Sequence, residues 1–132
     1  MKRFVGLLAA ALVILAGCAP TTTVTPQAST EQIARLPFAE AFRRVTTAIN
    51  TQPYPSDSGG WVITSSDQVG GFISAELNGK RYQFLTGTVP YRGFVSAALV
   101  SRGDSETAVN ISLNSEEESQ KLADSIRAAL GL

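Results

Sequence analysis

Residues 61–77, with the sequence WVITSSDQVGGFISAEL, decide the fold class of this chain. Apolar and polar residues alternate in residues 61–66 and again in residues 71–77, as they do in strands with one buried face. Residues 67–70 lie between them and combine Asp, Gln, Val and Gly, a composition that suits a turn. We therefore expect an antiparallel hairpin in this part of the chain.

The same alternation continues downstream and predicts further strands at residues 81–89, 93–101 and 106–113. Asn78 and Gly79 form a dipeptide typical of two-residue type I′ turns, so we expect the second strand to end just before them. Pro90 cannot donate a backbone hydrogen bond. We expect it to end the third strand or to lie at a sheet edge.

Helical patterns flank the strands on both sides. Residues 37–51 carry an apolar stripe at helical spacing, and Pro37 suits the first helical position. Near the C-terminus, Ser115 and Glu118 have the spacing of a capping box and predict the start of a second helix. The two apolar stripes consist of Phe38, Phe42, Val45 and Ile49, and of Leu122, Ile126, Ala129 and Leu130. The order predicts an α+β fold in which a four- to five-stranded antiparallel meander has both helices on one face.

The first 17 residues have the pattern of an export leader. Two basic residues precede an apolar run over residues 4–16, which at about 13 residues is too short to span a bilayer as a helix. The run ends in Leu15, Ala16, Gly17 and Cys18, a sequence that resembles the bacterial lipobox. We expect a signal peptide over residues 1–17, with Leu15, Ala16 and Gly17 as the cleavage motif.

Cys18 is the only cysteine of the chain, and its thiol can take a diacylglyceryl group. Two or three palmitate-like acyl chains, at about 0.8 kcal/mol per buried methylene, give stable anchoring. The alternatives are a plain secretory leader and a buried structural cysteine. Ala19 follows in place of the Asp that retains lipoproteins in the inner membrane, which implies the outer membrane facing the periplasm. A Gram-positive or cell-surface host would change that location.

The chain divides into three parts on composition. Residues 18–35 are rich in Thr, Pro and Ser, and predict a flexible tether behind the lipidated cysteine. Residues 36–132 form one small domain of a size that folds independently. Without the two basic residues of the leader, nine Lys and Arg face eleven Asp and Glu, which is no footprint for nucleic acid.

The catalytic equipment of common enzymes is missing from the sequence. The chain contains no histidine, and no serine lies in a Gly-x-Ser-x-Gly or Ser-x-x-Lys motif. Residues 116–118 are three consecutive glutamates that suit a helix start better than a metal site, because consecutive helical side chains diverge. Asp57, Asp67 and Asp104 adjoin Gly or Ser and are expected to form turns. We expect no enzyme, no metal and no cofactor.

Aromatic and basic residues meet in one part of the predicted sheet. Arg81, Tyr82, Tyr91 and Arg92 would cluster near the base of a hairpin if the third and fourth strands pair. Arg and Tyr are enriched at protein interfaces, which makes these four residues candidates for partner binding. The alternative is an ordinary solvated sheet edge. Trp61 is expected to be a core residue beneath a helix.

The motif Trp61-Val62-Ile63-x-x-Ser66-Asp67-x-x-x-Gly71-x-Ile73-x-Ala75, preceded by Phe38-x-x-x-Phe42, resembles small bacterial envelope lipoproteins of uncharacterised function. Helix-grip domains of the C subunit of the outer-membrane β-barrel assembly machinery have a comparable pattern. The resemblance implies no catalytic residues, and the single domain here argues against that subunit itself.

These features together favour a membrane-anchored periplasmic lipoprotein with a non-enzymatic role. The leading hypothesis is that it binds another envelope protein or helps to assemble or maintain the outer membrane. The alternative is a small-molecule or lipid-binding module with a pocket between helix and sheet. A hydrolase that uses carboxylates alone is the third hypothesis.

Overall fold

The computed structural model describes residues 30–132, so the predicted signal peptide, Cys18 and most of the predicted tether lie outside the described residues. The elements are β1 (Gln32–Ala34), α1 (Phe38–Thr51), β2 (Ser58–Asp67), β3 (Phe72–Gln83), β4 (Gly87–Ser101), β5 (Thr107–Leu113) and α2 (Glu117–Leu130). Every strand pairing is antiparallel. The expected α+β fold, with two helices and an antiparallel sheet, is confirmed.

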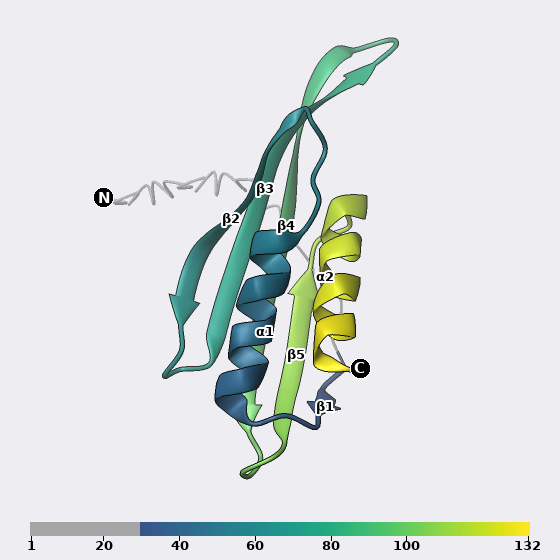
Figure 1. The fold of residues 1–132 in the computed structure, drawn as a ribbon. Coiled ribbons are helices and arrows are strands. Elements are labelled where there is room, and N and C mark those ends of the chain that lie inside the picture. The colour runs from purple at the N-terminus through teal and green to yellow at the C-terminus, as the bar shows by residue number, and fades with distance from the viewer. Residues whose placement is uncertain (1–29) are drawn as a thin grey trace, which may run out of the picture.

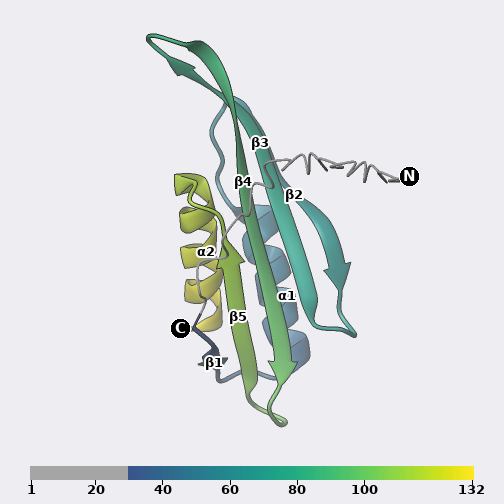
Figure 2. The same cartoon turned by 180° about the vertical axis from the view of Figure 1, so that it is seen from behind.

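The molecule has two layers. The five strands form one sheet in the order β1-β5-β4-β3-β2, so that β2 to β5 make a meander and β1 is added beside β5. Both helices lie on the same face of this sheet, and the other face is open (Figures 1 and 2). The arrangement follows from the strands, because only their alternate side chains are apolar and need cover.

The core lies between the two helices and the sheet. The helices contribute Phe42, Val45, Ile49, Leu122 and Ile126, and the strands contribute Ile73, Ala75, Val95, Ala97, Leu99, Val109 and Ile111. These side chains are exposed by 6% or less, so they fill the space beneath the helices. Trp61 and Phe38 are partly buried and pack against this core, in agreement with the apolar stripe and with the role predicted for Trp61.

The folded domain begins earlier than the predicted boundary at residue 36. Residues 32–34, which the sequence assigns to the tether, form β1 and pair with residues 107–109 of β5. Ala34 is fully buried, and the hydroxyl of Thr107 donates to the carbonyl of Leu36 at 2.9 Å. A three-residue strand has too little pattern to be recognised in the sequence, because its stability comes from the partner strand.

The predicted turn at Asn78 and Gly79 is wrong. β3 runs through both residues to Gln83, and Gly79 pairs with Tyr91 of β4. The Tyr91 ring packs over Gly79, where a Cβ would overlap it, so the aromatic ring covers the strand position that the glycine leaves bare. The chain reverses instead at residues 84–86, where the N–H of Thr86 donates to the carbonyl of Gln83. Gly87 follows directly and has a left-handed φ of 74°, which favours glycine.

β3 and β4 thus form a long hairpin that extends beyond the neighbouring strands of the sheet. β2 pairs with β3 only as far as Gly79, and β5 pairs with β4 only from Val95 onward. Beyond these points β3 and β4 continue together to Gln83 and Gly87. We call residues 80–90 the arm, which projects past the rest of the molecule (Figures 1 and 2).

Pro90 lies inside β4, opposite Lys80, and does not end a strand. The N–H of Lys80 donates to the carbonyl of Asp57 at 3.1 Å, so the backbone groups of this residue pair point away from the β3–β4 ladder. The backbone nitrogen of Pro90 therefore points away from β3, toward the edge of β4 that β5 does not cover at this position. No ladder hydrogen bond is lost because proline has no N–H. The expectation that Pro90 lies at an edge is therefore confirmed, and the expectation that it ends the third strand is wrong.

Both helices start one residue later than predicted. Pro37 is the N-cap residue of α1 and not its first helical residue. The N-cap residue of α2 is Glu116, and no side chain caps this helix, so the predicted capping box of Ser115 and Glu118 is wrong. Glu118 instead accepts a hydrogen bond from Nζ of Lys121 at 2.8 Å. The side chains of Asn114 and Ser119 both accept from the N–H of Phe94 in β4, and these bonds hold the chain where α2 begins.

Gly71 closes the turn between β2 and β3 and should be intolerant of substitution. Its φ is 71°, and an added Cβ would collide with the backbone carbonyl of Leu99, whose N–H donates to the Gly71 carbonyl at 2.7 Å. Gly71→Ala is expected to lower the free energy of unfolding by at least about 2 kcal/mol, from backbone strain and from the lost contact. Urea unfolding followed by the fluorescence of Trp61, the only tryptophan, measures this loss.

The matched control is Gly59→Ala in β2. A Cβ at Gly59 meets nothing within 4 Å, and its φ is not left-handed. This substitution should change the free energy of unfolding by less than about 1 kcal/mol. Equal effects of the two substitutions would contradict the assigned role of Gly71.

Candidate functional site

The four candidate binding residues lie on opposite faces of the hairpin. Arg81 and Tyr91 are on the side of the helices, where the guanidinium carbon of Arg81 sits 4.6 Å from the centre of the Tyr91 ring. Tyr82 and Arg92 are on the open face, where Arg92 pairs with Glu76 and Tyr82 is 73% exposed. The structure therefore brings together one pair of the predicted cluster and separates it from the other two residues.

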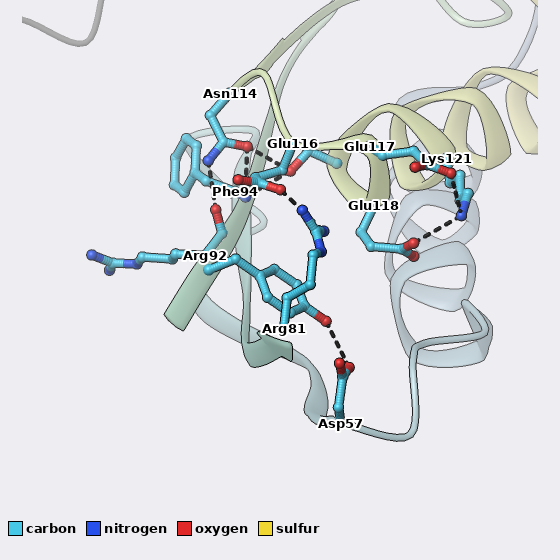
Figure 3. Close-up of polar contacts among 11 residues, drawn as sticks. Asp57, Arg81, Arg92, Phe94, Asn114, Glu116, Glu117, Glu118 and Lys121 are labelled. Carbon is cyan, nitrogen blue, oxygen red and sulfur yellow. Dashed lines mark hydrogen bonds and ion pairs between the residues drawn. The ribbon is translucent and has the colours of Figure 1, made fainter. Parts of the chain in front are cut away.

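Arg81 and Tyr91 belong to a four-residue group that we call the arm-base cluster: Asp57, Arg81, Tyr91 and Glu116. The Tyr91 hydroxyl donates to Oδ1 of Asp57 at 3.1 Å, and Nη2 of Arg81 lies 3.6 Å from Oε2 of Glu116 (Figure 3). The loop before β2, both strands of the hairpin and the start of α2 each supply one member. A cation over an aromatic ring and two carboxylates are thus held in one place.

The start of α2 adds a second charged group beside the arm-base cluster. Nζ of Lys121 lies 2.8 Å from a carboxylate oxygen of both Glu117 and Glu118 (Figure 3). The hydrogen bond to Lys121 lowers the pKa of Glu117, and the bonds to Glu117 and Glu118 raise the pKa of Lys121. Glu117 and Lys121 are therefore charged at neutral pH. Both glutamates also lie at the positive end of the helix dipole.

Tyr91 is held in its neutral form. Burial raises the pKa of its hydroxyl, and the hydrogen bond to Asp57 and the negative charge of Asp57 raise it further. The positive charge of Arg81 opposes this shift without cancelling it. At neutral pH the phenol is thus a hydrogen-bond donor, and its partner is Asp57.

A small polar junction fixes α2 against β4. The N–H of Phe94 donates to the Ser119 hydroxyl at 2.9 Å and to Oδ1 of Asn114 at 3.2 Å, and Ser119 donates to Asn114 at 2.6 Å (Figure 3). Nδ2 of Asn114 also donates to the carbonyl of Arg92 at 2.7 Å. Ser119 is fully buried, so the two bonds that its hydroxyl makes are shielded from water. The junction holds Glu116 within reach of Arg81.

One open hollow adjoins the arm-base cluster, and a second lies beside the ion pairs of Lys121. The first, of about 310 Å³, lies against the arm, between Asp57, Lys80, Pro90 and Tyr91. The second, of about 600 Å³, is lined by the loop after α1 and by the first turns of α2, including Tyr54, Glu118 and Lys121. Both lie at the surface, whereas the space beneath the helices is filled by the core. They suit contact with a larger molecule better than enclosure of a small one.

The predicted roles of the turn aspartates differ in outcome. Asp67 accepts hydrogen bonds from the N–H groups of Val69 and Gly70 at 3.0 and 2.9 Å, which confirms its turn-forming role. Asp57 instead receives the Tyr91 hydroxyl from 34 residues away. Sequence reasoning missed Asp57 and Glu116 as members of the site, because no local pattern signals a partner so distant in the chain.

The described residues contain neither a metal-binding cluster nor a membrane-spanning helix. Residues 30–132 contain no group of three or more His, Cys, Asp or Glu residues that could hold a metal ion. Neither helix of these residues, α1 or α2, is long and apolar enough to cross a membrane.

Comparison with known proteins yields similarity at the level of structure alone. No protein-family model matches the chain, and no curated protein matches its sequence. Among solved structures, TTHA0849 from Thermus thermophilus is 10% identical, with a TM-score of 0.36 over 77% of this chain and 94% of that one. A START superfamily protein from Mycobacterium smegmatis is 11% identical, with a TM-score of 0.37 over 80% and 97%.

The Zhui aromatase/cyclase from Streptomyces sp. R1128 is 6% identical, with a TM-score of 0.33 over 79% of this chain and 83% of that one. TM-scores this low assign no family, ligand or activity to the chain.

The raised pKa of Tyr91 gives a direct test of the arm-base cluster. Asp57→Asn removes a negative charge beside the phenol, so the pKa of Tyr91 is expected to fall, while staying above the usual value of about 10 because burial remains. NMR titration of the tyrosine ring carbons, assigned with Tyr91→Phe, measures the change. Asp104→Asn, in the exposed turn before β5, should leave it unaltered. An unchanged titration in Asp57→Asn would refute the contact.

Proposed function

We propose that this chain is a membrane-anchored periplasmic lipoprotein whose folded domain binds another envelope protein and catalyses no reaction. In this proposal Cys18 carries the lipid, and the lipid holds the protein at the outer membrane, where it faces the periplasm. The observation that carries the binding role is the arm-base cluster, an ordered group of Arg, Tyr and carboxylates beside an open surface hollow.

The composition of the arm-base cluster supports protein binding. Arg and Tyr are among the residues that most often dominate binding energy at interfaces, and both are held in place here before any partner binds. Tyr91 is about one-third exposed or less, and the Arg81 side chain is 49% exposed, so a partner can still cover them. The lack of histidine in the chain favours binding over catalysis.

The lipid anchor is testable by itself. Cys18→Ala removes the acceptor sulfur, so the chain is expected to lose its acyl groups and to stay unprocessed. Mass spectrometry of the mature N-terminal peptide, and fractionation of inner and outer membranes, measure both effects. A wild-type chain that begins at another residue, or that carries no acyl group, would contradict the proposal.

Removal of the arm-base cluster should release the protein partner. Arg81→Ala with Tyr91→Ala is expected to reduce recovery of a crosslinked envelope protein by at least about tenfold, because two anchor side chains are lost. The readout is quantitative mass spectrometry after crosslinking of intact envelopes and affinity purification of the tagged chain. Arg81→Gln keeps most of the aliphatic part of the side chain and should reduce the recovery of the crosslinked protein less.

The matched control for this experiment is Arg102→Ala. Arg102 is also a half-exposed arginine in an ion pair, with Glu31, but it lies in the turn after β4, at the end of the strand remote from the arm. Recovery should be unchanged in this variant. The arm-base cluster is not a binding site if no specific protein is recovered with the wild type. The same holds if Arg102→Ala reduces recovery as much as Arg81→Ala with Tyr91→Ala.

A further inference from the structure

The tip of the arm exposes large apolar side chains that the fold does not use. Phe84 is 89% exposed and Leu85 is 90% exposed, and both belong to the loop between β3 and β4. Figures 1 and 2 show this loop as the point of the molecule farthest from the helices. The pair does not stabilise the described domain, and it exposes apolar surface to water at a convex point.

The residues behind the tip are polar and basic in a definite order. Tyr82 is 73% exposed and lies two residues before Phe84, and Lys80 and Arg81 lie just behind it. There is no acidic residue between Glu76 and Asp104, so the charged residues of the arm are Lys80 and Arg81. Arg81 also contacts Glu116 of the arm-base cluster. Along the arm, the order is therefore an apolar tip, an amphipathic aromatic ring and a basic collar.

This order matches the depth profile of a lipid monolayer. Strands rise about 3.3 Å per residue, which places Lys80 roughly 13 Å behind Phe84. An apolar group that enters the boundary between headgroups and acyl chains goes in by about 5–10 Å, so the collar would lie among the headgroups. Tyr is a residue typical of that boundary, and Lys and Arg are attracted to anionic lipids.

A protein pocket is a poorer fit to the tip. Stable protein interfaces bury about 800 Å² on each partner, which is far more than a loop of three residues can supply. A bilayer needs no matching shape. The arm-base cluster, with its mixed charges and the hollow beside it, is the broader surface and lies on the helix side of the arm.

We infer that the tip of the arm inserts into an anionic lipid surface and gives the domain a second membrane contact besides Cys18. The inference rests on the membrane location proposed above and uses residues outside the arm-base cluster, apart from Arg81. The segment between Cys18 and β1 is long enough for the anchor and the tip to contact the membrane at the same time. β4 has 15 residues and is roughly 50 Å long, and residues 18–31 can span at most about 45–50 Å. The anchor and the tip can therefore touch one leaflet, although β1 and the tip lie at opposite ends of the sheet (Figure 1).

The test places an environment-sensitive fluorophore on the full lipidated chain. Leu85→Cys provides a single free thiol for a bimane label, because acylation blocks the sulfur of Cys18. The chain is reconstituted into vesicles of phosphatidylcholine with phosphatidylglycerol, and quenching by brominated lipid is measured. The label at residue 85 is expected to be quenched at least threefold more than in vesicles of phosphatidylcholine alone. Lys80→Gln with Arg81→Gln should remove most of that difference.

Val69→Cys is the matched control. Val69 is 99% exposed in the turn between β2 and β3, at the other end of the same strand ladder, and no basic residue lies near it in sequence. Its label should stay in water in both kinds of vesicle. A label at residue 85 that is quenched no more than the label at residue 69, or equally in both lipids, overturns the inference.

Vesicle flotation separates this result from the anchor itself. A chain that floats with its vesicles but keeps an aqueous label at residue 85 refutes the tip contact and leaves the lipid anchor intact. A chain that does not float with the vesicles refutes both the tip contact and the lipid anchor. Labelling of the parent chain, which has no introduced cysteine, would show that Cys18 is not acylated.

Discussion

The β3–β4 ladder is the constraint on which the rest of the structure depends. Its register runs without a break from Phe72 opposite Ala98 to Gln83 opposite Gly87, whereas the neighbouring strands stop earlier. Near Phe72 the ladder forms the centre of a sheet covered by helices, and near Gln83 it stands alone as the arm. One continuous hydrogen-bonded hairpin therefore connects the core of the protein to its most exposed part.

Glycine and proline positions make this ladder feasible. Gly79 would be a weak point in a strand, but the Tyr91 ring covers it and thereby joins the arm to the arm-base cluster. Pro90 would break a central strand, but it lies where the missing N–H faces an open edge. Gly93 leaves room for the Trp61 ring and for Ser119, so α2 can approach β4 closely enough for Glu116 to reach Arg81.

The apolar periodicity of the chain was a reliable guide where burial alone decides structure. Phe42, Val45 and Ile49 in α1, and Leu122 and Ile126 in α2, are buried as their spacing predicts. Periodicity failed wherever a local signal competed with a distant partner. Asn78 and Gly79 have the composition of a turn, yet pairing with β4 keeps them extended, and the three residues of β1 are ordered by β5 alone.

The sequence by itself determined the α+β class, the two helices to within one residue at their starts, and the buried faces of β2, of the first half of β3 and of β5, because these depend on residues a few positions apart. The strand predicted at residues 81–89 is wrong, since the β3–β4 turn lies inside it. The sequence also contains the contiguous lipobox-like residues 15–18, on which the proposed lipid anchor rests. The register of the hairpin, the arm, and the meeting of Asp57, Arg81, Tyr91 and Glu116 were decided by tertiary structure alone. The physical reason is that these contacts join segments tens of residues apart, and their geometry exists only after the strands have paired.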